Sequence, residues 1–133
     1  MRQEKQVVYC VVGKKQRPPE GRRWKGKVKT DEAGLQAVRP SRMTRKDFGV
    51  QPLLATEATH FFIPSIGATA GGRVYRFANI ADRDRMKAWF DELPRRSAAF
   101  YSHVFVHKNL LVQLNGNLPD ARAAKYKAVL DTL

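Results

Sequence analysis

The most constraining feature of this sequence is residues 98–116, where apolar side chains recur at every second position. Val104 and Val106 share one face of an extended chain there. A turn falls near residues 107–109, and residues 110–114 return with the same alternation. Side chains of a β-strand point alternately to its two faces, so a period of two predicts strands. The stretch is therefore predicted to be a β-hairpin, around which the rest of the chain must pack.

Amphipathic helices are predicted on both sides of this hairpin. Residues 79–93 place apolar side chains at helical spacing, and Asn79 stands where it can cap the first turn. Residues 118–133 form a second such pattern, with Pro119 in the first turn. Earlier in the chain, strands are expected at residues 6–13, 58–65 and 73–79, and short helical turns at 31–38 and from Ser41 or Thr44 to Phe48.

This order of elements predicts one α+β domain over residues 1–133. Locally paired strands favour a mainly antiparallel sheet with helices packed on one face, in a ferredoxin-like or related βαββα arrangement. Hydrophobic residues make up 43% of the chain and charged residues 28%, which is ordinary globular usage. The composition thus excludes wholesale disorder.

Positive charge is the outlying property. Lys and Arg number 25 against 12 acidic residues, which gives a net charge of +13. Residues 1–50 carry 14 basic and 5 acidic side chains, and much of the excess lies in residues 13–30, a basic loop or arm that contains Trp24. Lys and Arg neutralise phosphates, and Trp24 could stack on an unpaired base. The predicted nucleic-acid-binding residues are Lys14, Lys15, Arg17, Arg22, Arg23, Trp24, Lys25, Lys27, Lys29, Arg42, Arg45 and Lys46.

Two other interpretations of the arm remain open. A charged loop is often only solvated, and a basic surface can also bind an acidic protein. The leading hypothesis is a non-catalytic protein that binds RNA or DNA, or a nucleoprotein assembly, through the arm. The alternative is a protein-interaction module, such as an adaptor or a phage- or plasmid-encoded inhibitor that binds an acidic protein surface.

No membrane or export segment is expected. The apolar run of residues 7–12 is too short for a signal core or a membrane span. The single cysteine, Cys10, lies in this run, where it is expected to be a buried structural thiol. A cytoplasmic location is the expectation that follows.

No catalytic, metal or cofactor site is predicted. Glycines 67, 71 and 72 precede Arg73, but a phosphate-binding loop needs Lys and then Ser or Thr at this point, followed by a helix. His103 and His107 would lie ~13 Å apart along a strand, too far for one metal ion. An enzyme would require His60, His103 and Tyr101 to share a pocket. Further along the strand that begins at Arg73, Tyr75 and Phe77 could stack bases but are expected in the core.

Residues 72–133 resemble the C-terminal part of small actinobacterial exported proteins of unknown function. The resemblance rests on "RVYRFANIADRDRMKAWF" and "VFVHKNLLVQLNGNLPDARAAKY" and covers under half of the chain. It implies a βαββα fold and transfers no site. Those proteins usually begin with a signal or lipid-attachment segment, which is not expected for this chain, and the basic arm has no counterpart in them.

Overall fold

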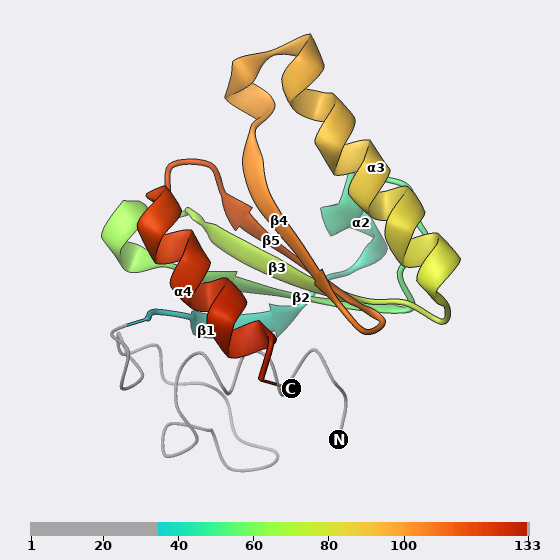
Figure 1. Cartoon of the computed structure of the whole chain (residues 1–133), viewed down its shortest axis with the longest axis horizontal. Coiled ribbons are helices and arrows are strands. Elements are labelled where there is room, and N and C mark those ends of the chain that lie inside the picture. Colours follow the sequence, from blue (N-terminus) through green and yellow to red (C-terminus); the bar gives the residue numbers. More distant parts are fainter. Residues whose placement is uncertain (1–34, 133) are drawn as a thin grey trace.

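A five-stranded sheet forms the centre of the part of the protein that the structure describes (Figure 1). The structure is a computed structural model, and it describes residues 35–132. The strands lie in the order β1-β2-β3-β5-β4, and every neighbouring pair is antiparallel. Their bounds are β1 (Val38–Arg42), β2 (Glu57–Phe62), β3 (Gly71–Arg76), β4 (Ser102–His107) and β5 (Leu110–Asn115).

Three α-helices accompany the sheet in the described part of the chain. Asn79 begins the longest, as predicted, because its side-chain oxygen accepts a 2.8 Å hydrogen bond from the backbone N–H of Asp82. None of the described helices is both long and apolar enough to cross a membrane. The helices are α2 (Arg45–Phe48), α3 (Ile80–Arg96) and α4 (Asp120–Leu130), with short 3-10 turns η2 (Pro64–Ile66) and η3 (Ala98–Phe100).

The predicted α+β class and antiparallel sheet are confirmed. Helix α3 connects β3 to β4, and β5 returns between these two strands, so the chain from β3 to α4 runs in the order βαββα. The hairpin predicted around residues 107–109 is β4 and β5, which pair from His107 and Leu110 to Ser102 and Asn115.

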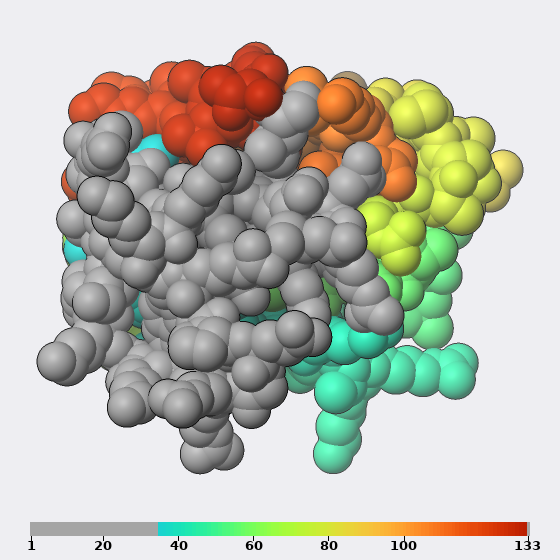
Figure 2. All heavy atoms as spheres, turned by 90° about the horizontal axis from the view of Figure 1, so that it is seen from below, coloured from blue at the N-terminus to red at the C-terminus, as the bar shows by residue number. Residues whose placement is uncertain are grey.

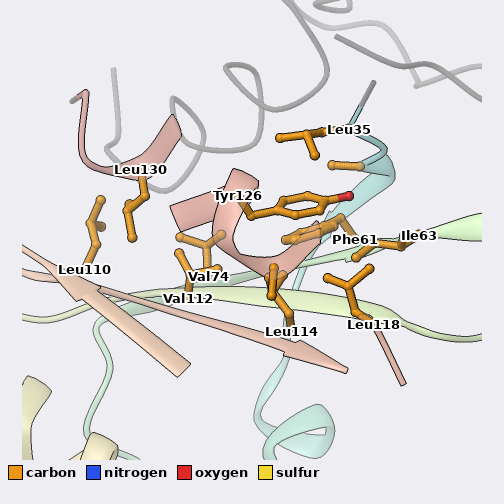
Figure 3. Close-up of a cluster of buried hydrophobic side chains, with 12 residues drawn as sticks. Leu35, Phe61, Ile63, Val74, Leu110, Val112, Leu114, Leu118, Tyr126 and Leu130 are labelled. Carbon is orange, nitrogen blue, oxygen red and sulfur yellow. The ribbon is translucent and has the colours of Figure 1, made fainter. Parts of the chain in front are cut away.

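The helices cover opposite faces of the sheet, which corrects the expectation that they pack on one. Val74 belongs to a core cluster with Tyr126 of α4 (Figure 3). The next residue, Tyr75, belongs to a second cluster with Phe90 of α3, and their ring centroids lie 6.0 Å apart. Consecutive residues of a strand point to opposite faces, so a central strand that is apolar on both sides needs cover on both.

Strand β1 was not predicted. The sequence suggested helical turns over residues 31–38, whereas residues 38–42 form an edge strand in which Ser41 pairs with His60 of β2. Among the described strands β1 has a ladder partner on one side only, and Pro40 is tolerated in such a strand. The predicted short helix that ends at Phe48 is confirmed as α2, but the strand predicted at residues 6–13 and the basic arm lie outside the described residues.

The glycine-rich connection between β2 and β3 ends inside the sheet. Gly71 and Gly72 are the first residues of β3, so a strand follows the glycines, as the sequence indicated. A Cβ atom on Gly72 would lie 2.7 Å from the backbone oxygen of Gln113 and 2.7 Å from the ring of Phe61. The glycine is therefore required by close packing of β3 against its neighbours.

We expect Gly72→Ala to lower the free energy of unfolding by about 1 to 3 kcal/mol, the usual cost of overpacking a core. Urea denaturation followed by circular dichroism measures this change. Gly49→Ala is the control, because its Cβ would meet nothing within 4 Å and only the positive φ of 55° would oppose it. A Gly72→Ala variant as stable as the unaltered protein would contradict this account of the packing.

Candidate functional site

Only three of the residues predicted to bind nucleic acid lie in the described part of the chain. Arg42 of β1 is 63% exposed, and its guanidinium lies 3.9 Å from the carboxylate of Glu57, which also pairs with Arg76 at 3.4 Å. Arg42 pairs with Thr59 in the ladder and so lies toward the face that α4 covers. Residues Lys14, Lys15, Arg17, Arg22, Arg23, Trp24, Lys25, Lys27 and Lys29 lie outside the described residues.

The other two described cations of this set lie on α2. Arg45 and Lys46 are exposed, and neither forms an ion pair with a carboxylate of the described residues. Figure 2 shows side chains of this teal segment projecting from the surface. Phe48 anchors α2 in the cluster that contains α3, so Arg45 and Lys46 belong to the face opposite Arg42. The structure therefore divides the three cations between two faces.

The face of the sheet against which α3 packs is called the α3 face below. A polar hollow opens on this face, beyond the part that α2 and α3 cover. In the ladder, His60 pairs with Arg73, and Arg73 pairs with Gln113, so the three form one row across β2, β3 and β5. All three are partly exposed. The hollow measures about 150 Å³, and it is lined by His60, Thr69, Gly71, Gly72, Arg73, Gln113 and Asn115.

Arg73 is the central cation of the hollow. Within the described part of the chain it forms no ion pair with a carboxylate. Its positive charge lies near Tyr75, which is fully buried and whose hydroxyl donates a 2.7 Å hydrogen bond to the side-chain oxygen of Gln51. Burial raises the pKa of Tyr75 to about 12, so this phenol near Arg73 stays neutral at physiological pH. The charge of Arg73 also lowers the pKa of Asp47 of α2, so this carboxylate lies near enough to offset part of the positive charge without forming an ion pair.

His60 supplies an imidazole beside Arg73. Burial lowers the pKa of His60 below its ordinary value of 6.5, and the charge of Arg73 lowers it further, while Asp47 of α2 opposes both. The ring of Phe62 lies edge-on to the ring of His60, with centroids 4.6 Å apart. His60 is therefore neutral at pH 7 and can become cationic when an anion binds nearby.

An Arg–aromatic pair borders the hollow. The guanidinium of Arg39 lies 4.5 Å from the ring centroid of Phe62, a distance typical of a cation–π contact. Arg39 has a positive φ of 51°, and the β1–β2 register shifts between Val38 and Ser41. A bulge of this kind redirects a side chain, and a non-glycine residue at positive φ costs about 1 to 2 kcal/mol. The local backbone thus holds an exposed guanidinium over a half-buried ring.

His60 and His103 do not share a pocket. His60 lies on the α3 face, whereas His103 lies on the opposite face, beside α4. His103 is 6% exposed, and its Nε2–H donates a 2.7 Å hydrogen bond to the carbonyl of Leu118. Its Nδ1 lies 3.4 Å from the Tyr101 hydroxyl. The active site that would combine His60, His103 and Tyr101 is not assembled, and the described residues hold no group of three His, Cys, Asp or Glu side chains that could bind a metal ion.

Sequence reasoning missed most of the hollow. It noted Arg73 as a cation after the glycines, and it placed Tyr75 and Phe77 in the core, where both are fully buried. His60, Phe62 and Gln113 carried no motif. The sequence feature that could have indicated the hollow was the position of Arg73. This charged residue lies two places before Tyr75, on the same face of an apolar strand.

Comparisons of the chain with protein-family models, with curated proteins and with solved structures find no match. The resemblance of residues 72–133 to exported actinobacterial proteins stays a prediction of the sequence.

We expect His60 to make the protein less stable in mild acid. Its pKa is lowered in the folded state, so below pH 6.5 the unfolded chain binds the proton more readily. The free energy of unfolding therefore falls as the pH drops below 6.5. Urea denaturation at pH 5, 6 and 7 should give a weaker pH dependence for His60→Gln than for the unaltered protein.

His107→Gln is the matched control, because it removes a half-buried imidazole of β4 and leaves His60 unchanged. The contribution of His60 to the acid dependence should persist in this variant. Identical pH profiles for His60→Gln and the unaltered protein would show that the burial of His60 does not govern its protonation.

Proposed function

We propose that this protein binds single-stranded RNA or DNA through the uncovered part of the α3 face, together with its basic arm. The observation that carries the proposal is the row of His60, Arg73 and Gln113 on a central part of the sheet that no described helix covers. An antiparallel sheet that exposes cations and aromatic rings is a common platform for single strands. The net charge of +13 supports a polyanionic partner.

The side chains of this surface suit phosphate and base contacts. Arg73 and the amide of Gln113 can donate hydrogen bonds to phosphate oxygens, and hydrogen bonds to a charged oxygen are strong. The planar guanidinium of Arg39 can stack on a base, as arginine does in many RNA complexes. Arg45 and Lys46 of α2 extend the positive surface on the same face.

The basic arm would add affinity without sequence preference. Each cation that neutralises a phosphate releases a counterion, so binding should weaken steeply with salt. The arm residues proposed to act in this way are Lys14, Lys15, Arg17, Arg22, Arg23, Lys25, Lys27 and Lys29, with Trp24 available for stacking.

The test is fluorescence anisotropy with a labelled twelve-nucleotide RNA and the DNA of the same sequence, over a range of salt concentrations. We expect Arg73→Gln to weaken binding about tenfold, since a hydrogen bond to a charged group is worth about 1.5 to 3 kcal/mol. Changing Arg22, Arg23, Lys25 and Lys27 to Glu should flatten the salt dependence.

Arg85→Gln is the matched control. It removes the same charge from α3, where Arg85 lies 3.7 Å from Asp82, and it should change affinity by less than about twofold because one exposed surface charge contributes little. If neither oligonucleotide binds at low salt, the proposal is wrong. Stoichiometric capture of an acidic protein that survives nuclease treatment would favour the protein-interaction alternative.

A further inference from the structure

The hollow is lined by hydrogen-bond donors that converge on a small volume. Arg73 contributes a guanidinium, His60 an imidazole, Gln113 and Asn115 carboxamides, and Thr69 a hydroxyl. None of the described carboxylates lines it, and Asp47 of α2 acts on His60 and Arg73 from outside the lining. A concave site whose lining has a cation, several neutral donors and no described acid favours an anion.

The size of the hollow indicates which part of a nucleic acid could enter it. About 150 Å³ is less than the roughly 300 to 1,000 Å³ of pockets that enclose whole small molecules. A phosphate group fits within this volume, whereas a base with its sugar would extend beyond it. Gly71 and Gly72 of β3 form part of the lining, so the backbone of the sheet limits how deep an entering group can go.

A terminal phosphate uses these donors better than an internal one. A phosphomonoester has three unesterified oxygens and a charge of about −1.5 to −2 at pH 7. An internal phosphodiester has two such oxygens and a single charge, and the strand must leave it in two directions. A hollow with five residues that can donate hydrogen bonds therefore matches the three free oxygens of the monoester better than the two of the diester.

The Arg39–Phe62 pair lies where the terminal nucleotide would continue. Phe62 contacts His60, which lines the hollow, and Arg39 covers the Phe62 ring at 4.5 Å. Arg39 is exposed, so the outer surface of its guanidinium is available to a base. A phosphate in the hollow and a base on Arg39 would together hold one nucleotide at the end of a strand.

We propose that the hollow binds the terminal phosphomonoester of a nucleic-acid strand, with Arg73 and His60 as its charged contacts and Arg39 as the stacking surface for the end base. The inference rests on the proposed function, because it names the part of the strand that the α3 face recognises. A site of this kind makes the protein selective for strands whose end carries a phosphate.

Proton uptake accompanies this binding. Among the described residues, the charged groups that act on His60 are Arg73 of β3, which disfavours its protonation, and Asp47 of α2, which favours it. A bound phosphomonoester adds two negative charges beside the ring and outweighs Arg73. Binding therefore strengthens as the pH falls toward 6, provided that the ester remains a dianion.

The experiment compares three labelled oligonucleotides of one sequence, with a 5′-phosphate, with a 3′-phosphate or with hydroxyls at both ends. Anisotropy titrations should show that one phosphorylated form binds at least about tenfold more tightly than the hydroxyl form, which corresponds to 1.4 kcal/mol. Arg73→Gln should abolish the preference. Arg85→Gln should retain it, because Arg85 lies on α3 and does not line the hollow.

The pH dependence of binding is measured with His60→Gln as the reference protein. Both proteins experience the titration of the ester, whose second pKa is about 6, so the ratio of their affinities isolates His60. This ratio should rise in favour of the unaltered protein between pH 8 and pH 6. Inorganic phosphate should compete with the phosphorylated strand more effectively than with the hydroxyl strand.

The outcomes separate this inference from the proposed function. Salt-sensitive binding that is equal for all three oligonucleotides overturns the terminal-phosphate site and leaves strand binding intact. No binding of any oligonucleotide overturns the proposed function as well. A phosphoserine peptide of equal length that binds more tightly than the phosphorylated strand also overturns the inference, since it assigns the hollow to a protein ligand.

Discussion

The antiparallel pairing of β3 with β5 is the interaction on which the rest of the structure depends. Each of these strands is apolar on both faces, because Val74 pairs with Val112 on one side and Tyr75 with Leu111 on the other. A shift of one residue in the pairing of β3 with β5 would move the side chains of each face to the opposite face. They would then lie against the wrong helix. The register therefore fixes α4 on one side and α3 on the other, and it also fixes the row in which Arg73 stands.

The candidate site exists because the two faces are covered unequally. Next to Tyr75 and Leu111 the α3 face is closed by Phe48, Met86 and Phe90. One row further along the strands, the side chains change from apolar to polar and become partly exposed. The same strands thus carry a core at one end of this face and a hydrated, cationic hollow at the other, and rigid ladder hydrogen bonds hold the polar groups in position.

The sequence predicted the local elements well where a single periodicity dominated. The hairpin of β4 and β5, the capped helix α3 and the strand after Gly72 follow from alternation, helical spacing and turn residues, which are local properties. Strand β1 was missed because its formation depends on the free edge of β2, and Pro40 argues against a strand when residues 38–42 are considered alone. The distribution of helices over both faces also depends on which strands become neighbours.

The sequence by itself determined that this chain is a strongly basic α+β domain, because charge and periodicity are properties of the residues. It placed the charge in an arm, and the proposal for that arm still rests on sequence. Only the tertiary structure brought His60, Arg73 and Gln113 into one row, and it separated His60 from His103 by the thickness of the sheet. These relations depend on strand order and register, which long-range pairing decides and no local pattern encodes.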